Sequence, residues 1–171
     1  MIAVPTPVPV RIRRGRDPDA GELFTLQRAA FLSEAQRCRD PMLPPLRDTV
    51  EDVLRVLRDP AVTVLVSVAS GDSDLGRRGR IVGSVRVAAV GSTGQVGRIV
   101  VAPDLPGRGI GSALLAAVHA EASAAGLTDL ELFTGTASSS NLALYRRHGY
   151  AEGRATSDER GTTLRVLHRD V

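Results

Sequence analysis

The spacing of apolar residues changes along the chain and predicts strands interleaved with helices. Val-rich runs at 62–69 and 81–89 flank a loop at 70–79 that is rich in Gly, Ser and Asp, which predicts a hairpin with a long loop. The other strands are predicted at residues 8–13, 96–101 and 130–134, and in a closing hairpin of 150–154 and 163–168 around 158–161.

Apolar residues spaced three or four positions apart predict four helices between these strands. The first two follow Asp17-Pro18-Asp19 and the capping-box sequence Thr49-x-x-Asp52, and the proline-rich segment 40–45 separates them. The third runs from residue 109 to a stop at Gly126, and the fourth from 138 to a break at Gly149. The resulting order, βααβββαβαββ, predicts an α/β fold with a mixed sheet.

Length and composition indicate one globular domain over residues 1–171. The chain is 43% hydrophobic, so it can bury a core, and its core must be built from Val, Leu, Ile and Ala because only 3% of residues are aromatic. Trp is absent, which disfavours a base-stacking surface for nucleic acid. With three prolines in the first ten residues and no apolar run of 18, the sequence predicts a cytoplasmic protein without membrane contact.

The charged residues narrow the chemistry further. All 22 basic residues are arginine, which excludes a phosphate-loop NTPase and a Schiff-base lysine enzyme. The net charge of +3 suits an anionic small molecule as easily as a nucleic acid. The three His and the single Cys38 are not spaced as metal ligands are, so we expect no metal site. Cys38 has no His or acidic residue at the spacing of a catalytic motif, so we expect this thiol to be inert.

A strand, a glycine-rich turn and a helix follow one another in residues 99–112, IVVAPDLPGRGIGS. Three alternating glycines allow a tight turn and expose backbone N–H groups at a helix N-terminus, which favours a phosphate or pyrophosphate. Tight turns also need glycine for conformation alone, so this loop by itself leaves both interpretations open. A dinucleotide-binding GxGxxG motif fails in both registers, because its third glycine would fall on Ser112 or Leu114.

Together with residues 141–150, NLALYRRHGY, this segment resembles the GNAT superfamily of acyl-CoA-dependent N-acyltransferases. The resemblance implies a GNAT-like fold with a mixed, mostly antiparallel central sheet flanked by helices. It also implies acetyl-CoA as the acyl donor and a small-molecule or peptide amine as the acceptor. The residues implied in binding the donor are Ile99, Val100, Val101, Arg108, Gly109, Ile110, Gly111, Ser112 and Asn141.

Two positions depart from the family pattern. Pro106 stands where the family usually has Gln or Arg, and it supplies neither a side-chain donor nor a backbone N–H to the pyrophosphate. Ser138 stands where many members have Asn, whereas Asn141 shares a helix face with Tyr145 and can take that role.

The resemblance assigns Tyr145 as the general acid that protonates the departing CoA thiolate, the alternative being a tyrosine that only packs. The general base stays open among Glu131, Glu22, Glu34 and a water relayed to a backbone carbonyl, and Gln95 stands where some relatives carry an acid.

The remaining polar residues are expected at the surface. These are His119, His148 and the basic stretch of Arg11, Arg13, Arg14 and Arg16. The exposed edge of the final hairpin offers a surface on which two subunits can pair as a homodimer.

We therefore expect an N-acetyltransferase that acts on a primary amine. A second hypothesis is a non-catalytic acyl-CoA-binding sensor or interaction module, favoured by Pro106 and the unidentified base and opposed by Tyr145.

Overall fold

The computed structural model describes residues 9–70, 79–135, 139–157 and 163–171. The side chains of residues 37 and 38 lie outside this description, so the inertness of Cys38 stays a prediction. The strands are β1 (Val10–Arg14), β2 (Val62–Ala69), β3 (Ile81–Val90), β4 (Thr93–Val101), β5 (Asp129–Gly135), β6 (Ala151–Ser157) and β7 (Thr163–Asp170). The helices are η1 (Asp17–Asp19), α1 (Ala20–Cys38), α2 (Pro44–Arg47), α3 (Val50–Arg58), α4 (Ile110–Ala124) and α5 (Ser139–Arg147).

The strands form one sheet in the order β1-β2-β3-β4-β5-β7-β6. Every neighbouring pair is antiparallel except β4 and β5. The sequence predictions of a mixed, mostly antiparallel sheet, of the β2–β3 hairpin and of the closing β6–β7 hairpin are thus confirmed. The structure adds the single-turn helix α2, which begins at the end of the proline-rich segment 40–45 and continues to Arg47. Pro44 and Pro45 occupy its first turn, a position at which proline is favourable.

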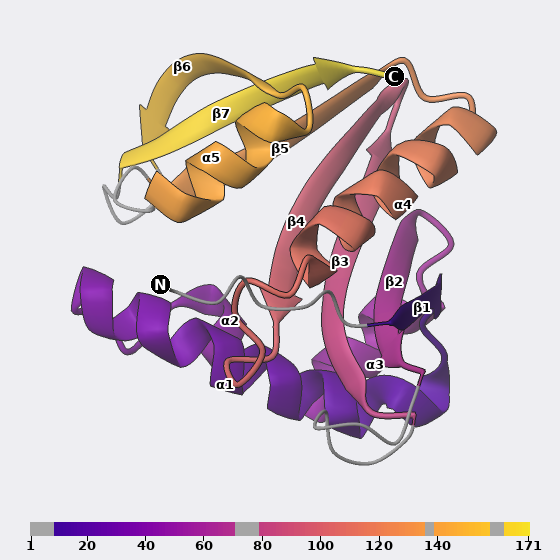
Figure 1. The fold of residues 1–171 in the computed structure, drawn as a ribbon, viewed down its shortest axis with the longest axis vertical. Coiled ribbons are helices and arrows are strands. Elements are labelled where there is room, and N and C mark those ends of the chain that lie inside the picture. The colour runs from indigo at the N-terminus through magenta and orange to yellow at the C-terminus, as the bar shows by residue number, and fades with distance from the viewer. Residues whose placement is uncertain (1–8, 71–78, 136–138, 158–162) are drawn as a thin grey trace, which may run out of the picture.

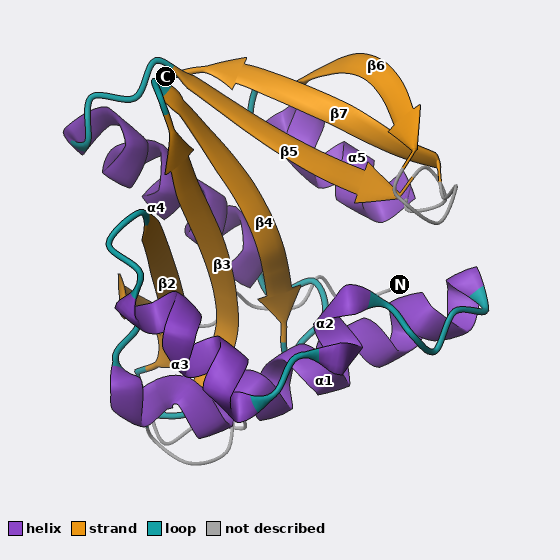
Figure 2. Ribbon diagram, turned by 180° about the vertical axis from the view of Figure 1, so that it is seen from behind, coloured by secondary structure: helices purple, strands orange, loops and turns teal. Residues whose placement is uncertain are grey.

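Helices cover both faces of the sheet. α4 and α5 lie on the face turned to the viewer in Figure 1, and α1, α2 and α3 lie on the opposite face, seen from behind in Figure 2. Because β2 is covered on both sides, six consecutive residues of it are buried, and it shows no alternation of apolar and polar residues.

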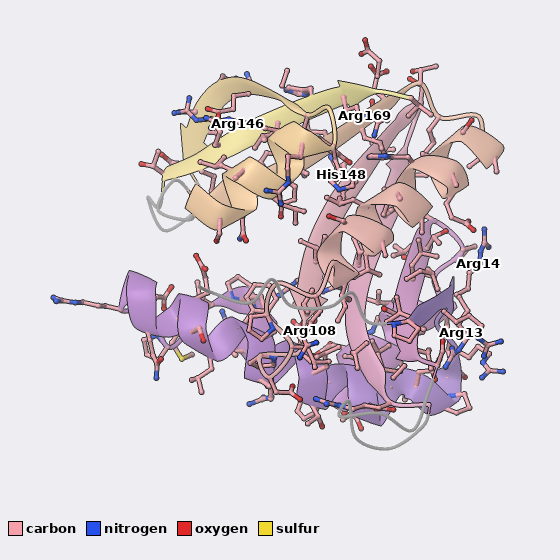
Figure 3. All side chains as sticks on the ribbon, viewed as in Figure 1. Arg13, Arg14, Arg108, Arg146, His148 and Arg169 are labelled. Carbon is pink, nitrogen blue, oxygen red and sulfur yellow. The ribbon has the colours of Figure 1, made fainter. Side chains whose placement is uncertain are left out.

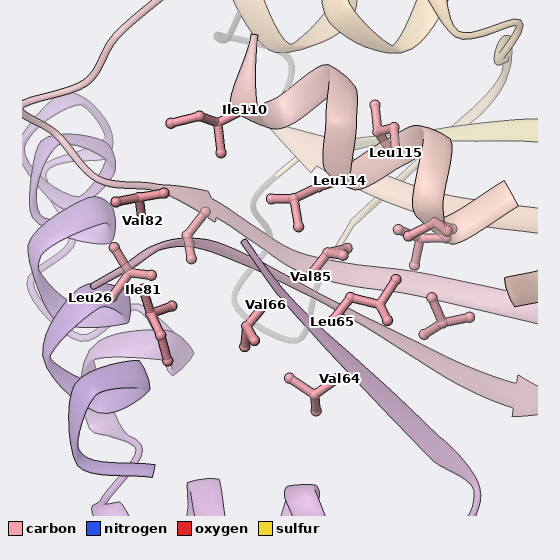
Figure 4. Packing of buried hydrophobic residues seen from close by; sticks show 14 of the residues in the cluster. Leu26, Val64, Leu65, Val66, Ile81, Val82, Val85, Ile110, Leu114 and Leu115 are labelled. Carbon is pink, nitrogen blue, oxygen red and sulfur yellow. The ribbon is translucent and has the colours of Figure 1, made fainter. Parts of the chain in front are cut away.

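The core lies between these layers. Figure 4 shows Leu26 of α1 and Leu114 of α4 reaching the sheet from opposite sides, around Val66 and Val82. On the α1 side, α3 begins as the sequence predicted: the Thr49 hydroxyl accepts a hydrogen bond from the backbone N–H of Asp52 at 3.2 Å, while the Asp52 carboxylate accepts one from the backbone N–H of Thr49 at 2.9 Å.

Strands β4 and β5 separate along their length. Their parallel pairing joins residues 93–96 to residues 129–132, and both strands continue beyond it to Val101 and Gly135. Figures 1 and 2 show the two strands diverging at these ends. A β-bulge, in which Arg98 and Ile99 lie opposite the single residue Val85 of β3, bends β4 at this point, with Arg98 at the positive φ of 51°.

Candidate active site

The divergence of β4 and β5 leaves backbone groups without a strand partner. Within the described ladder, no residue of β5 pairs with β4 after Val96. The backbone N–H and C=O groups of residues 97–101 on this side can therefore bind a ligand in place of a strand. This is the stretch from which Ile99, Val100 and Val101 were predicted to hold the acyl donor.

A pocket of about 210 Å³ lies at this opening. It is formed by α1, β4, the start of α4 and α5, and it brings together six of the predicted residues: Ile99, Val100, Val101, Gly111, Asn141 and Tyr145. From α1 it adds Ala30, Phe31 and Glu34, of which Glu34 alone was considered for a role in catalysis. The two motifs that the sequence places far apart thus share one pocket.

The glycine loop between β4 and α4 leads into the same pocket. Gly107 and Gly109 have φ of 70° and 79°, so both take the left-handed conformation that glycine adopts without steric cost. The loop is anchored by buried Leu105 and by Arg80, whose guanidinium donates two hydrogen bonds to the Asp104 carboxylate at 2.7 and 2.8 Å. The start of helix α4 is therefore held in a fixed position beside the opening.

The predicted loop residues divide into two groups. Ile110 is 1% exposed and belongs to the core. Gly109 is exposed, whereas Arg108 and Ser112 are half-buried. Figure 3 shows Arg108 on the loop that precedes α4, between α4 and the helices of the opposite face in this view. These four residues do not line the 210 Å³ pocket but lie on the chain next to Gly111, which does.

Tyr145 is the phenol that the pocket presents. Its side chain is 4% exposed, and its ring packs edge-on against Tyr150 with 6.1 Å between the ring centroids. Burial, followed by the neighbouring Tyr150 and Glu34, raises the pKa of Tyr145 above its usual value. The hydroxyl therefore stays protonated at neutral pH, as a proton donor must.

The structure separates the candidates for the general base. Glu34 lines the pocket with Tyr145, and both also line a second, larger pocket. The Glu22 carboxylate accepts a hydrogen bond from the backbone N–H of Ile81 at 2.8 Å, which gives it a structural role. Glu131 lies 3.5 Å from His168 of β7, and neither it nor its strand neighbour Gln95 lines either pocket.

The larger pocket has a volume of about 430 Å³ and opens between α1, α2, β4 and β5. Its walls are largely apolar, with Phe31, Pro44 and Phe133 among them, and its charged residues are Glu34 and Arg98. Arg98 was not among the residues predicted for the site, although a charged residue inside the apolar run of β4 could have indicated it.

The histidines and arginines that were expected at the surface lie away from the two pockets. His119 and His148 are half-buried rather than exposed, because their rings, 6.0 Å apart, pack with Arg169 and Tyr150 where α4, α5 and β7 meet. The basic residues of β1 lie at the opposite edge of the sheet, where Arg13 pairs with Asp19 at 2.7 Å (Figure 3). Ser138 lies outside the described residues. Among the described helices, none has the length and apolar character to cross a membrane.

Comparison with known proteins agrees with this geometry. A sequence model described as an acetyltransferase (GNAT) domain matches residues 65–152, just over half of the 171 residues. The chain belongs to the GNAT acetyltransferase family. The matched region runs from β2 to the start of β6 and so includes the diverging strands, the glycine loop and Tyr145.

Proteins similar to this GNAT acetyltransferase carry different names. A protein named IAA acetyltransferase from Azospirillum brasilense is 36% identical over 99 residues, and the match spans 58% of this chain and 61% of the relative, less than two thirds of its length. Among solved structures, PaiA N-acetyltransferase from Thermoplasma acidophilum in complex with coenzyme A aligns with a TM-score of 0.74, at 12% identity over 95% of this chain and 99% of its own. Ribosomal-protein-alanine N-acetyltransferase from Brucella melitensis gives a TM-score of 0.74 at 19% identity, over 94% and 99% of the two chains.

Proposed function

We propose that this acetyltransferase transfers the acetyl group of acetyl-CoA to a primary amine by direct attack of the amine on the thioester. The observation that carries the proposal is the 210 Å³ pocket, in which the unpaired backbone of β4, Gly111, Glu34 and Tyr145 meet. Residues 1–171 act as one domain in this proposal, and the reaction takes place in the cytoplasm.

The residues present fit an acyl-CoA. Backbone groups of Ile99, Val100 and Val101 have the spacing and freedom to hold the extended arm of the donor as a further strand would. A Cβ built on Gly109 meets no atom of the described residues within 4 Å, which leaves room for a pyrophosphate beside this turn. Such a group would lie at the N-terminus of the 15-residue helix α4, where the N–H groups and the helix dipole favour an anion.

Two side chains then transfer the protons, one as a base and one as an acid. As the amine nitrogen bonds to the carbonyl carbon and the carbon–sulfur bond breaks, Glu34 accepts the proton that the nitrogen loses. Tyr145 donates its proton to the departing sulfur and regains one from solvent, so that the products are an amide and the free thiol of CoA. Glu34 and Tyr145 line the same two pockets, which supports this division of work.

Glu34 is our choice of base because of its position. It comes from α1, on the acceptor side of β4, and it is the acidic residue that both pockets share. The name of the A. brasilense relative suggests IAA as one compound to include among candidate substrates.

The second hypothesis, a module that binds acyl-CoA without turnover, is favoured by Pro106, an exposed residue that offers the pyrophosphate no hydrogen bond. Two measurements on the same protein separate the hypotheses: calorimetric binding of CoA, and release of free thiol from acetyl-CoA in the presence of a panel of amines. We expect binding together with amine-dependent thiol release. Binding with no thiol release across the panel would support the non-catalytic module.

A further inference from the structure

Two arginines and one carboxylate lie together beside the 430 Å³ pocket, which we take as the acceptor pocket and which Arg98 lines. The Nη2 atoms of Arg86 and Arg98 are 3.6 and 3.4 Å from the same carboxylate oxygen of Asp48. That oxygen also accepts a hydrogen bond from the side chain of Gln27 at 2.8 Å. The cluster therefore carries one more positive charge than negative charge.

This excess charge is largely shielded from water. The side chains of Arg86, Arg98 and Asp48 are each 23% exposed, and burial lowers the pKa of Arg86 to about 10 and also lowers that of Arg98, so both guanidiniums remain charged at neutral pH. The Nη1 atom of Arg98 is buried and has no hydrogen-bond partner among the residues that the structure describes. A buried charge is costly unless it is paired, so an anion is the expected partner of this cluster.

Arg98 separates two cavities of very different size. The cavity on the side of α3 has about 20 Å³, room for a water molecule but not for a ligand. The other is the 430 Å³ pocket, which falls in the range of small-molecule sites. Since Arg98 lines both, the 430 Å³ pocket is the one of the two with room for an external anion beside it.

The acceptor pocket also contains Glu34, so it holds one group suited to an ammonium and one suited to a carboxylate. Its remaining lining is largely apolar. Building on the function proposed above, we propose that the amine acceptor also bears a carboxylate, as an α-amino acid with an apolar side chain does, and that Arg98 binds this carboxylate. Arg98 is then a residue that determines specificity, separate from the two that move protons.

The test compares each amino acid with its amide, in which a neutral group of nearly equal shape replaces the carboxylate. L-phenylalanine and L-leucine are assayed against L-phenylalaninamide and L-leucinamide with the wild type and with Arg98→Met. Methionine retains much of the length of arginine and is likewise a non-glycine residue, so the backbone strain at φ 51° is similar in the variant. Asp48 keeps Arg86 and Gln27 as partners, which favours a folded variant.

The quantity to follow is kcat/KM for the acid divided by kcat/KM for its amide. We expect the wild type to prefer the acids and Arg98→Met to lower the ratio at least about fivefold. Comparing variant with wild type cancels the difference in amine basicity between acid and amide. Arg154→Met, which removes an exposed charge of β6 that lines neither pocket, should leave the ratio unchanged. A smaller fall for Arg98→Met, or an equal fall for Arg154→Met, overturns the proposal.

A binding measurement keeps this inference apart from the proposed function. In the presence of CoA, N-acetyl-L-phenylalanine should raise the Tm of the wild type more than N-acetyl-L-phenylalaninamide does, and Arg98→Met should abolish the difference. If these shifts occur while no amine is acetylated, the site binds the carboxylate and the proposed activity is wrong. If amines are acetylated but the two compounds shift Tm equally, the activity stands and the carboxylate site is wrong.

Discussion

Replacing Tyr145 with Phe removes one hydroxyl from the site and leaves the rest of the side chain in place. The ring is 4% exposed and keeps its edge-on contact with Tyr150, so Tyr145→Phe should fold normally and bind CoA as the wild type does. What the variant loses is the proton that we assign to the departing sulfur. The expected effect is therefore on kcat.

The size of the effect follows from the surroundings of the phenol. Burial, with smaller contributions from Tyr150 and Glu34, raises its pKa, which keeps it protonated but makes it a weaker acid than a thiol, whose pKa is about 8.5. Proton transfer from such a phenol to a thiolate is uphill, so the hydroxyl first hydrogen-bonds the developing charge on the sulfur and completes the transfer as it regains a proton from solvent. General acids contribute about 10² to 10⁴ in rate, and we expect the lower end, about 10²-fold or about 2.7 kcal/mol.

Single-turnover release of CoA thiol, with the best amine from the panel, measures this step directly. Tyr150→Phe is the matched control, since it makes the same change in the neighbouring ring. The buried hydroxyl of Tyr150 has no hydrogen-bond partner among the described residues, and Tyr150 lines neither the 210 Å³ nor the 430 Å³ pocket. The rate of this variant should stay within about threefold of the parent, and its Tm should not fall, because no hydrogen bond is lost. A Tyr145→Phe rate within about threefold of the parent would refute the assignment and leave Tyr145 a packing residue.

Three further predictions address the donor site, the base and the pH dependence of stability. Gly109→Ala should weaken CoA binding by calorimetry far more than Gly126→Ala, which strains the other end of the loop–helix unit at a similar φ of 70°, and equal losses would argue against a donor at Gly109. Glu34→Gln should lower kcat about 10²-fold at unchanged CoA affinity, whereas Glu131→Gln should not, and the reverse order would move the base to β5. Burial and nearby positive charge lower the pKa of His119 from 6.5 to about 4, so the unfolded chain binds its proton first. Tm should therefore fall as pH drops from 6.5 towards 4, less steeply in His119→Gln, and identical slopes would contradict this.

Much of the fold followed from the sequence because its signals were local. The capping box at Thr49 and the valine run of β2 depend on neighbouring residues alone, and both lie where they were predicted. The start of β4 was placed at residue 96 rather than at Thr93, since Gly94 is unfavourable within a strand. Pairing of these residues with both β3 and β5 overrides that preference.

The donor side of the site was accessible to sequence analysis because its residues fall in two short motifs. The acceptor side was not, since its pocket is assembled from α1, α2 and the separated ends of β4 and β5. Glu34 could be named only as one of several acids, because the register that turns it toward Tyr145 depends on how α1 packs. Arg98 and Asp48 lie 50 residues apart in the chain, so no spacing rule connects them.

The most direct test of the account is whether the acetyl group itself moves from acetyl-CoA to an amine. Purified protein is incubated with acetyl-CoA labelled with ¹³C in the acetyl group and with the amine panel, and both products are measured by mass spectrometry. We predict labelled N-acetyl product and free CoA in equal amounts from the wild type, with formation of both slowed about 10²-fold in Tyr145→Phe. CoA bound by the pocket without any labelled amide, or thiol released without it, would contradict an N-acetyltransferase.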